Sequence, residues 1–342
     1  MEEFNLDIQT FLEKSLTIPV IDVRSPAEFE HGHIPGASNL PLFNNEERSI
    51  VGTLYFQKGS SEAIMKGLEL TGPKMKEYAE KAMDIAKEKE VLLHCWRGGM
   101  RSNSMAWLLN TVGIKANTLT GGYKTYRQYI RSYFTRSVNL IVIGGMTGSG
   151  KTDVLEALES MGKQVIDLEG MAGHKGSAFG NIGLPTQITT EQFENDLFTR
   201  ISQLNPEEAV YIEDESLAIG RIFIPEDFFK QMSEARLINL DVPLEMRVQR
   251  LVETYAGGNL SELISAVKHL ERRIGLENAT KAIACINNDE MEEAVKIILQ
   301  YYDKIYLHGT HMQKRKEIKE IEVSGENISE IAQNIIGLTD YS

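Results

Sequence analysis

The chain has 342 residues, a hydrophobic content of 42% and a formal net charge of −13 at pH 7. This length favours two domains, each with a core of its own. No apolar stretch approaches the roughly 20 residues of a membrane helix, and the acidic start Met1-Glu2-Glu3 is unlike a signal or transit peptide. We therefore expect a cytoplasmic protein without membrane contact.

Short apolar strands alternate with helices over the first third of the chain. The predicted elements are a strand at 18–23, a helix from 27, an apolar run at 38–42, a helix at 74–90, a strand at 90–94, a helix at 102–111, a strand at 116–119 and a connecting helix at 124–137. This alternation is typical of a parallel sheet covered by helices.

A cysteine stands where the strand at 90–94 gives way to a helix. The segment His94–Ser102 (HCWRGGMRS) combines Cys95 with two arginines and two glycines. Loop amides, the helix N-terminus and nearby cations all favour a thiolate there. The alternative is a buried cysteine that acts as a small apolar side chain. We interpret Cys95, Arg97 and Arg101 as catalytic residues, and the second cysteine, Cys285, as part of an apolar helix.

Three segments of this region resemble landmarks of the rhodanese family. They are residues 21–29 (IDVRSPAEF), 32–37 (GHIPGA) and 95–102 (CWRGGMRS). The resemblance implies a rhodanese-like domain in which Cys95 carries a transferable chalcogen held by loop amides, with Asp22 and Arg24 in structural or rim positions. Residues 44–70 depart from the rhodanese pattern, and we expect them to contact substrate.

The alternating pattern restarts at Val138 with a second buried strand. Further elements are predicted as a helix at 151–161, a strand at 164–168, a helix at 191–203, strands at 209–213 and 236–241, a helix at 243–254, a helical stretch at 259–305, a strand at 318–323 and a helix at 329–336. The predicted fold class is α/β throughout. A rhodanese-like parallel-sheet domain (1–132) precedes a P-loop NTPase-like domain (133–342).

The strand that starts at Val138 leads into a phosphate-binding sequence. Residues 145–152 (GMTGSGKT) fit the pattern GxxxxGK[ST], between a strand and a helix as the motif requires. Amides of such a loop and the helix N-terminus hold phosphates, Lys151 neutralises them, and Thr152 is a candidate metal contact. The predicted phosphate-binding residues are Gly145, Gly148, Ser149, Gly150, Lys151 and Thr152.

The carboxylate that usually accompanies such a loop has two candidate positions. Glu213 and Asp214 end one strand, and Asp167 ends another. The alternative for 213–215 is a solvated acidic turn. Mg²⁺ is compatible with either position, and we expect no tightly bound cofactor. Arg247 and Arg250 either reach phosphates or face water.

Residues 91–152 contain none of the chain's 49 Asp and Glu residues, but eight Lys and Arg residues. A basic strip on an acidic body fits a polyanionic ligand bound at one place. The alternative is that acids are disfavoured around two anion-binding loops.

Several loops of the second half, taken with the thiol and phosphate loops, resemble the tRNA 2-selenouridine synthase family. They are residues 167–170 (DLEG), 174–180 (HKGSAFG) and 213–216 (EDES). The resemblance implies a fusion of rhodanese and P-loop domains that replaces the C2 sulfur of wobble 2-thiouridine in the tRNA anticodon by selenium. It implies the substrates selenophosphate, which selenophosphate synthetase would deliver, and geranyl diphosphate, which forms an S-geranyl intermediate. Candidate substrate or metal contacts are Asp167, Glu169, His174, Ser177, Glu213 and Asp214.

Within this resemblance, the phosphate loop would hold geranyl diphosphate and Cys95 would bind or carry selenium. The basic linker would contact tRNA through Lys124, Arg127, Arg131 and Arg136. Its tyrosines at 123, 126, 129 and 133 either stack on RNA or form a buried helical stripe. Two alternatives stay open: a sulfurtransferase coupled to an ATP- or GTP-binding P-loop domain, and a non-catalytic module that senses nucleotide.

Overall fold

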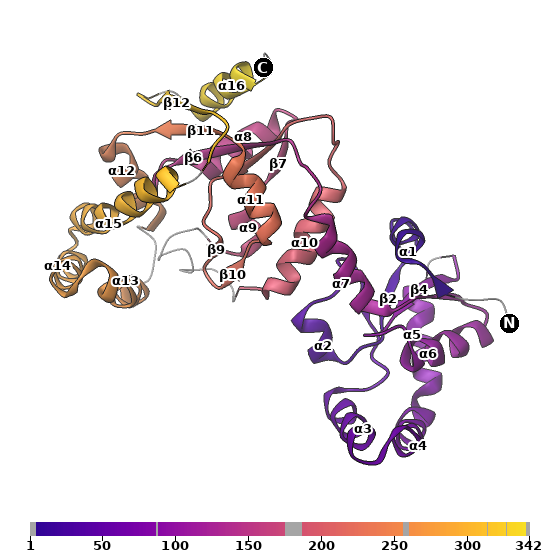
Figure 1. The fold of residues 1–342 in the computed structure, drawn as a ribbon. Coiled ribbons are helices and arrows are strands. Elements are labelled where there is room, and N and C mark those ends of the chain that lie inside the picture. The colour runs from indigo at the N-terminus through magenta and orange to yellow at the C-terminus, as the bar shows by residue number, and fades with distance from the viewer. Residues whose placement is uncertain are drawn as a thin grey trace. The chain divides into compact units, whose positions relative to one another are not determined.

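The computed structural model describes residues 5–86, 88–174, 187–255, 260–312, 314–325 and 327–339. The chain divides into two compact units, both α/β (Figure 1). Unit 1 contains Met1–Tyr133 and Glu194–Thr199, and unit 2 contains Phe134–Phe193 and Arg200–Ser342. Among the described residues, we find no helix that combines the length and the apolar character of a membrane span.

Unit 1 is built on a five-stranded parallel sheet with the strand order β1-β5-β4-β2-β3. Its strands are β1 (Asn5–Leu6), β2 (Val20–Asp22), β3 (Ser38–Asn39), β4 (Glu90–His94) and β5 (Lys115–Leu119). The central strand β4 is apolar at its three middle positions, Val91, Leu92 and Leu93, which are fully buried, as expected for a strand covered on both faces. Its carboxyl end leads directly into the loop that carries Cys95.

The helices of unit 1 include all those that the sequence pattern predicts, and three more that it does not, α1, α3 and α4. They are α1 (Ile8–Ser15), α2 (Pro26–His31), α3 (Asn45–Lys58), α4 (Ser60–Thr71), α5 (Met75–Ile85), α6 (Met100–Thr111) and α7 (Gly122–Tyr133). The added helix α1 starts at Asp7, whose carboxylate accepts hydrogen bonds from the amides of Gln9 and Thr10.

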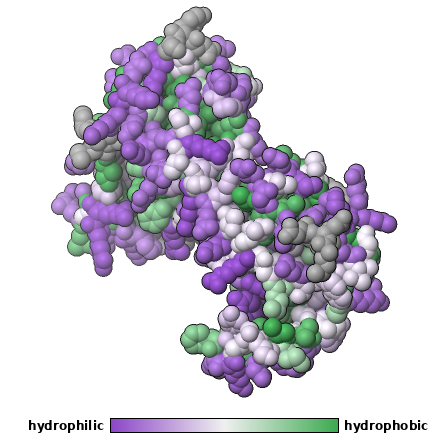
Figure 2. Space-filling model, turned by 45° about the vertical axis from the view of Figure 1, so that its right-hand side comes forward, coloured by the Kyte–Doolittle hydropathy of each residue, from purple (hydrophilic) through white to green (hydrophobic). Residues whose placement is uncertain are grey.

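Residues 44–70, which interrupt the rhodanese pattern, form the helical hairpin α3–α4. Asn44 caps α3 through a reciprocal pair of hydrogen bonds with Glu47, and Gly59 turns the chain between the helices at a φ of +91°. Apolar side chains lie exposed on this hairpin at the bottom of Figure 2. The large ones are Ile50, Tyr55, Phe56, Ile64, Met65 and Leu68.

A buried ion pair fixes the end of β2. The Arg24 side chain is 1% exposed, and its Nε and Nη2 atoms donate to both carboxylate oxygens of Asp22 at 2.6–3.0 Å. Arg24 Nη2 also donates to the carbonyl of Gly32 at 2.6 Å, and its guanidinium lies 3.8 Å from the ring centre of Tyr123. The Nε and Nη2 donors of this charged group are thus paired within the chain itself, which gives Arg24 a structural role.

Unit 2 contains a second five-stranded parallel sheet, with the order β12-β11-β6-β8-β7. Its strands are β6 (Leu140–Gly145), β7 (Gln164–Ile166), β8 (Val210–Glu213), β11 (Arg236–Asp241) and β12 (Ile318–Glu322), and a small antiparallel hairpin joins β9 (Ala218–Ile219) to β10 (Ile222–Phe223). The central strand β6 is buried at every position and ends at the phosphate loop.

Some helices of unit 2 pack on this sheet, and others form a separate helical cluster with its own apolar core (Figure 1). They are α8 (Lys151–Ser160), α9 (Leu168–Ala172), α10 (Thr190–Ser202), α11 (Glu226–Glu234), α12 (Leu244–Tyr255), α13 (Leu260–Ile274), α14 (Leu276–Asn287), α15 (Met291–Met312) and α16 (Ile328–Thr339). The predicted elements do not include α9, α11 or the β9–β10 hairpin. The helix α11 nevertheless has an apolar side, on which Phe228 and Met232 are buried. Within α10, Glu194–Thr199 belong to unit 1.

The buried ion pair predicts a large loss of stability when one partner is removed. Asp22→Ala leaves the Arg24 guanidinium buried without its counter-charge, which costs about 3–5 kcal/mol in comparable cases. We expect a clearly lower melting temperature by calorimetry. The control, Asp7→Ala, removes only a helix cap worth about 1 kcal/mol, and an equal effect of both variants would contradict the structural role of Asp22.

Candidate functional sites

The thiol of Cys95 is buried at the carboxyl end of β4 and is surrounded by hydrogen-bond donors. Its Sγ lies 3.3 Å from Ser102 Oγ, and the amide of Gly99 donates to it at 3.3 Å. Gly99 and Ser102 belong to the loop and the first turn of α6, so the helix N-terminus is directed at the sulfur as the sequence predicts. Between Cys95 Sγ and Ser102 Oγ either atom can be the donor. The thiol is therefore held as an acceptor and not as a plain apolar side chain.

Two glycines let the thiol loop contact the start of α7. A Cβ atom at Gly98, where φ is +59°, would overlap the carbonyl oxygen of Leu119, and one at Gly122 would overlap the carbonyl oxygen of Cys95. The close approach allows the amides of Tyr123 and Lys124 to donate to the carbonyls of Cys95 and Trp96 at 2.8 and 3.0 Å. The beginning of α7 therefore supports the backbone of the thiol loop.

Opposing effects act on the pKa of Cys95, and the net shift is downward. Burial raises the pKa, whereas the side chain of Ser102, the amides of Gly99 and Ser102, and then the charge of Arg101 lower it. Hydrogen bonds thus outweigh the arginine in stabilising the thiolate. The predicted catalytic set contains the two arginines and omits Ser102. The signal for Ser102 is its position in the first turn of the helix that follows Cys95.

The charge of Arg101 is shared with Glu28 of α2. Arg101 donates to the two carboxylate oxygens of Glu28 at 2.7 and 3.3 Å. Burial raises the pKa of Glu28, but Arg101, the amide of Ser25 and Arg48 lower it to about 2, so this carboxylate stays charged. Arg97, by contrast, is exposed beside the loop. Of the two predicted arginines, Arg97 is thus the one on the surface.

The histidine before the thiol is fully buried. Burial lowers the pKa of His94, against the opposing charge of Asp22, whose Oδ2 lies 3.7 Å from Nε2. A neutral ring fits this environment. Among the described residues neither ring nitrogen has a hydrogen-bond partner, and the ring packs 5.8 Å from that of Tyr123.

Most of the basic linker folds as α7, which ends at Tyr133 and not at the predicted residue 137, so Arg136 lies beyond the helix. The linker residues differ in accessibility. Lys124, Arg131 and Arg136 are exposed, so their contact with tRNA stays a prediction. Arg127 is 5% exposed, pairs with Glu194 and donates to Asn195 Oδ1 at 2.6 Å. This buried pairing leaves Arg127 little capacity to meet RNA.

The tyrosines of α7 form the buried helical stripe that the spacing allowed. Tyr123 and Tyr126 are fully buried, and Tyr126, Tyr129 and Tyr133 contact the edge of Phe198. Tyr123 also accepts a hydrogen bond from Asn195 Nδ2 at 2.8 Å. These rings therefore pack inside unit 1, and stacking on RNA is not their role in this structure.

The phosphate loop joins β6 to α8 with the backbone that its sequence predicts. Gly145, Gly148 and Gly150 have φ angles of +148°, +82° and +84°, which L side chains rarely adopt. Lys151 Nζ donates to the carbonyl of Gly145 at 3.0 Å. The Ser149 hydroxyl is buried and has no hydrogen-bond partner among the described residues. Thr152 is exposed at the helix start.

The two arginines of α12 have different positions relative to this loop. Arg247 is 4% exposed and forms two 2.9 Å hydrogen bonds with Asp303, besides one to the carbonyl of Thr147. Arg250 is more exposed and lies against Gly148 and Gly150, with its Nε 3.6 Å from Asp153. Arg250 is therefore the better placed of the two to meet a phosphate.

Glu213 ends β8 next to the phosphate-loop strand and is 2% exposed. Its Oε1 accepts from the amide of Glu169 at 2.6 Å, whereas Oε2 is buried without a partner among the described residues. Burial and the charge of Asp167 raise the pKa of Glu213 well above its usual value. Burial and Glu169 also raise the pKa of Glu215, against the attraction of Lys151.

The other candidate contacts of unit 2 have separate roles. Asp214 forms an ion pair with the buried Arg315, and Asp167 caps α9 by accepting from the amide of Gly170 at 2.7 Å. His174 is buried, and burial lowers its pKa. Ser177 lies outside the described residues. In the described part of the chain, no group of three or more His, Cys, Asp or Glu side chains is arranged to hold a metal ion.

Comparison with known proteins matches both units to family models. Residues 7–129 match the rhodanese-like domain, and residues 138–335 match the tRNA 2-selenouridine synthase AAA domain. A tRNA 2-selenouridine synthase from Hydrogenovibrio crunogenus is 35% identical over 90% of this chain and 92% of its own length. One from Nitrosomonas europaea is 41% identical over 69% of this chain and 63% of its own length.

Among solved structures, the N-terminal domain of a putative ATP/GTP binding protein from Clostridium difficile 630 is 38% identical. It covers 36% of this chain and 97% of that domain, with a TM-score of 0.34.

The hydrogen bonds around Cys95 predict which substitution changes its reactivity most. Ser102→Ala removes the largest stabilising contact of the thiolate, so the pKa of Cys95 should rise and alkylation by iodoacetamide should slow at neutral pH. Arg101→Gln should have a smaller effect because Glu28 shares the arginine charge. The measurement is the alkylation rate against pH, with Ser104→Ala on the exposed side of α6 as control. A larger effect of Arg101→Gln would contradict this order.

The buried carboxyl of Glu213 predicts a stability that depends on pH. Its pKa is raised above the 4.5 of an unperturbed glutamate, so the folded state holds this proton more tightly than the unfolded chain. This contribution to stability is present below pH 4.5 and is lost as pH rises through the folded pKa. We expect the melting temperature of Glu213→Gln to fall less over that range than that of the wild type. Glu207→Gln, which alters an exposed acid before β8, should follow the wild type.

Proposed function

Because this chain belongs to the tRNA 2-selenouridine synthase family, we propose that it replaces sulfur by selenium at C2 of a 5-substituted 2-thiouridine. The base would be the wobble uridine of tRNA, and the reaction would take place in the cytoplasm. The observation that carries the proposal is the pair of intact loops in one chain. One loop holds a thiol whose pKa is lowered, and the other has the glycine backbone and lysine of a phosphate site.

Two successive reactions would connect these loops. First, the thiocarbonyl sulfur attacks C1 of geranyl diphosphate, the C1–O bond breaks, and diphosphate leaves. Then selenium supplied by selenophosphate adds at C2, and the C2–S bond breaks with departure of geranyl thiol. Phosphate is the other product, with an oxygen taken from water. Alkylation is useful because an S-alkylated sulfur at C2 leaves as a thiol far more readily than the sulfur of a free thiocarbonyl group.

The phosphate loop would serve the first reaction. Loop amides and Lys151 would hold the diphosphate and stabilise the charge that develops as it leaves. Arg250, beside Gly148 and Gly150, would add a second cation. Thr152 and Glu213 are the residues that a magnesium ion carried by the diphosphate would meet. An unpartnered buried oxygen on Glu213 is consistent with a cation nearby.

The thiol loop would serve the second reaction. Cys95, as a thiolate stabilised by Ser102 and loop amides, would attack the phosphorus of selenophosphate, so that the P–Se bond breaks and selenium is released at the selenide level to add at C2. Water would then cleave the S–P bond, which gives phosphate and returns the free thiol. The exposed Arg97 would attract the anionic selenophosphate, which selenophosphate synthetase would deliver. Lys124, Arg131 and Arg136 would contact the tRNA backbone.

The two loops predict separable defects. Lys151→Ala should abolish geranylation of 2-thiouridine tRNA but still selenate tRNA that is supplied already geranylated. Cys95→Ala should accumulate geranylated tRNA and form little selenouridine. Nucleosides are measured by mass spectrometry after incubation with geranyl diphosphate and selenophosphate, and Cys285→Ala should behave as the wild type.

Two results would contradict this division. Equal loss of both products in both variants would show that the loops do not act in separate steps. An unchanged nucleoside together with nucleotide hydrolysis or sulfur transfer from a simple donor would favour the sulfurtransferase alternative.

A further inference from the structure

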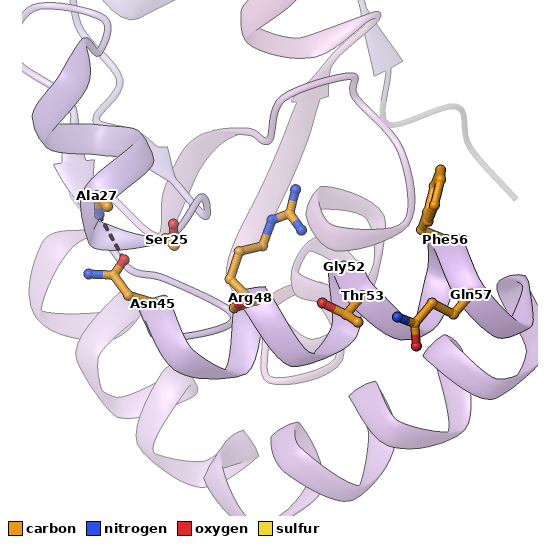
Figure 3. Close-up of a pocket in the computed structure, with 9 residues that line it drawn as sticks. Ser25, Ala27, Asn45, Arg48, Gly52, Thr53, Phe56 and Gln57 are labelled. Atoms are coloured by element: carbon orange, nitrogen blue, oxygen red, sulfur yellow. Dashed lines mark hydrogen bonds between the residues drawn. The ribbon is translucent and has the colours of Figure 1, made fainter.

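A pocket of about 580 Å³ opens in unit 1 between the start of α2 and the first three turns of α3 (Figure 3). None of the residues that line it belongs to the thiol loop or the phosphate loop. Asn45 Oδ1 accepts from the amide of Ala27 at 2.9 Å and closes one end. Phe56 and Gln57 stand at the other end of the row in Figure 3. Its volume lies in the range of sites for small molecules and single nucleotides.

The pocket has an excess of positive charge. Arg48 Nε lies 3.4 Å from Glu28 Oε2, but Glu28 is already bound by Arg101, so two guanidinium groups share one carboxylate. The neighbouring acid Glu47 is held by Lys74. Among the described residues, the buried Nε of Arg48 has no hydrogen-bond partner, and the side chain as a whole is 39% exposed. The guanidinium is therefore accessible to an anionic group of a ligand.

Gly52 leaves room for the Arg48 guanidinium beside the helix. A Cβ atom at this position would come within 2.7 Å of Arg48 Nη1. Without that atom, the guanidinium lies over the helix surface and toward the pocket (Figure 3).

An aromatic ring completes the pocket. Phe56 is 90% exposed, which leaves the ring available for contact. Asn45, Ser49, Thr53 and Gln57 add donors and acceptors along the same wall. One cation, one open aromatic ring and a row of amides and hydroxyls match the phosphate, the base face and the base edge of an unstacked nucleotide. A free phosphate ion would leave the ring unused, and an apolar chain would leave the polar wall unpaired.

The position of the pocket relates it to the thiol loop. Ser25 follows the carboxyl end of β2, and Cys95 follows that of the adjacent parallel strand β4, so both lie at one edge of the sheet. The charged contacts Arg101–Glu28–Arg48 run from the thiol-loop helix to the pocket wall.

We propose that this pocket binds a nucleotide of the tRNA anticodon loop that flanks the wobble uridine. Its phosphate would lie on Arg48 and its base on Phe56. The inference rests on the proposed function, since it takes tRNA as the substrate, and it assigns a site for substrate binding to the hairpin α3–α4.

The test uses the full chain and a synthetic anticodon stem-loop RNA with 2-thiouridine at the wobble position. Phe56→Ala and Arg48→Gln should each weaken binding, measured by fluorescence anisotropy, about fivefold or more. The matched controls lie on the same helix outside the pocket. Tyr55→Ala removes an exposed ring and Lys58→Gln an exposed charge, and both should bind like the wild type.

Abasic substitutions locate the contact. Removing the base next to the wobble uridine should weaken binding to the wild type by a similar factor and add nothing to the loss in Phe56→Ala. Unchanged RNA affinity in Phe56→Ala, while the wild type still selenates tRNA, would overturn this inference and leave the proposed function standing. Absence of RNA binding by the wild type would overturn both.

Discussion

The thiol site depends on one buried cation. Arg24 is enclosed by the Asp22 carboxylate, the Gly32 carbonyl and the face of Tyr123, and each of these groups comes from a different segment of unit 1. A buried guanidinium tolerates few alternative arrangements, because every lost partner leaves an uncompensated charge. Tyr123 is in turn held by Asn195 and begins the helix whose amides support the carbonyls of Cys95 and Trp96. Groups that do not contact the sulfur therefore hold the backbone of the loop from which Gly99 and Ser102 reach it.

Most of the fold follows from local sequence pattern. The apolar runs at 90–94 and 236–241 coincide with β4 and β11, and the phosphate loop takes the backbone that its glycines require. These predictions succeed because each rests on neighbours within a few residues. The strands β9 and β10 are too short to show an apolar period. The helix α11 does have one, with Phe228 and Met232 on its buried side, and its absence from the predicted elements is an error of the prediction.

Charge pairing could not be predicted, because it joins residues far apart in the chain. Residues 91–152 lack acids, yet Arg101, Lys115 and Arg127 find Glu28, Glu90 and Glu194 in the fold. The basic strip of the sequence is thus partly neutralised. Only the structure shows which of the basic residues stay exposed on the surface. The pairing of Arg101 with Glu28 is one example of this neutralisation. In the fold, the hydrogen bonds of Ser102 and Gly99 lower the pKa of Cys95 more than the charge of Arg101 does.

Buried acids, and not buried cations, dominate the electrostatics beside the phosphate loop. Glu213 and Glu215, with raised pKa values, lie close to Asp167, Glu169 and Lys151. A diphosphate brought to this loop adds further negative charge beside these carboxyls. Repulsion then favours either protonation of the carboxyls or entry of a cation with the ligand. A buried carboxyl that already holds its proton accommodates the anion at little electrostatic cost, whereas an ionised one requires the cation. The phosphate binding proposed for this loop would therefore be favoured by protonated carboxyls or by a cation that enters with the ligand, and the upward pKa shift of Glu213 acts in the first direction.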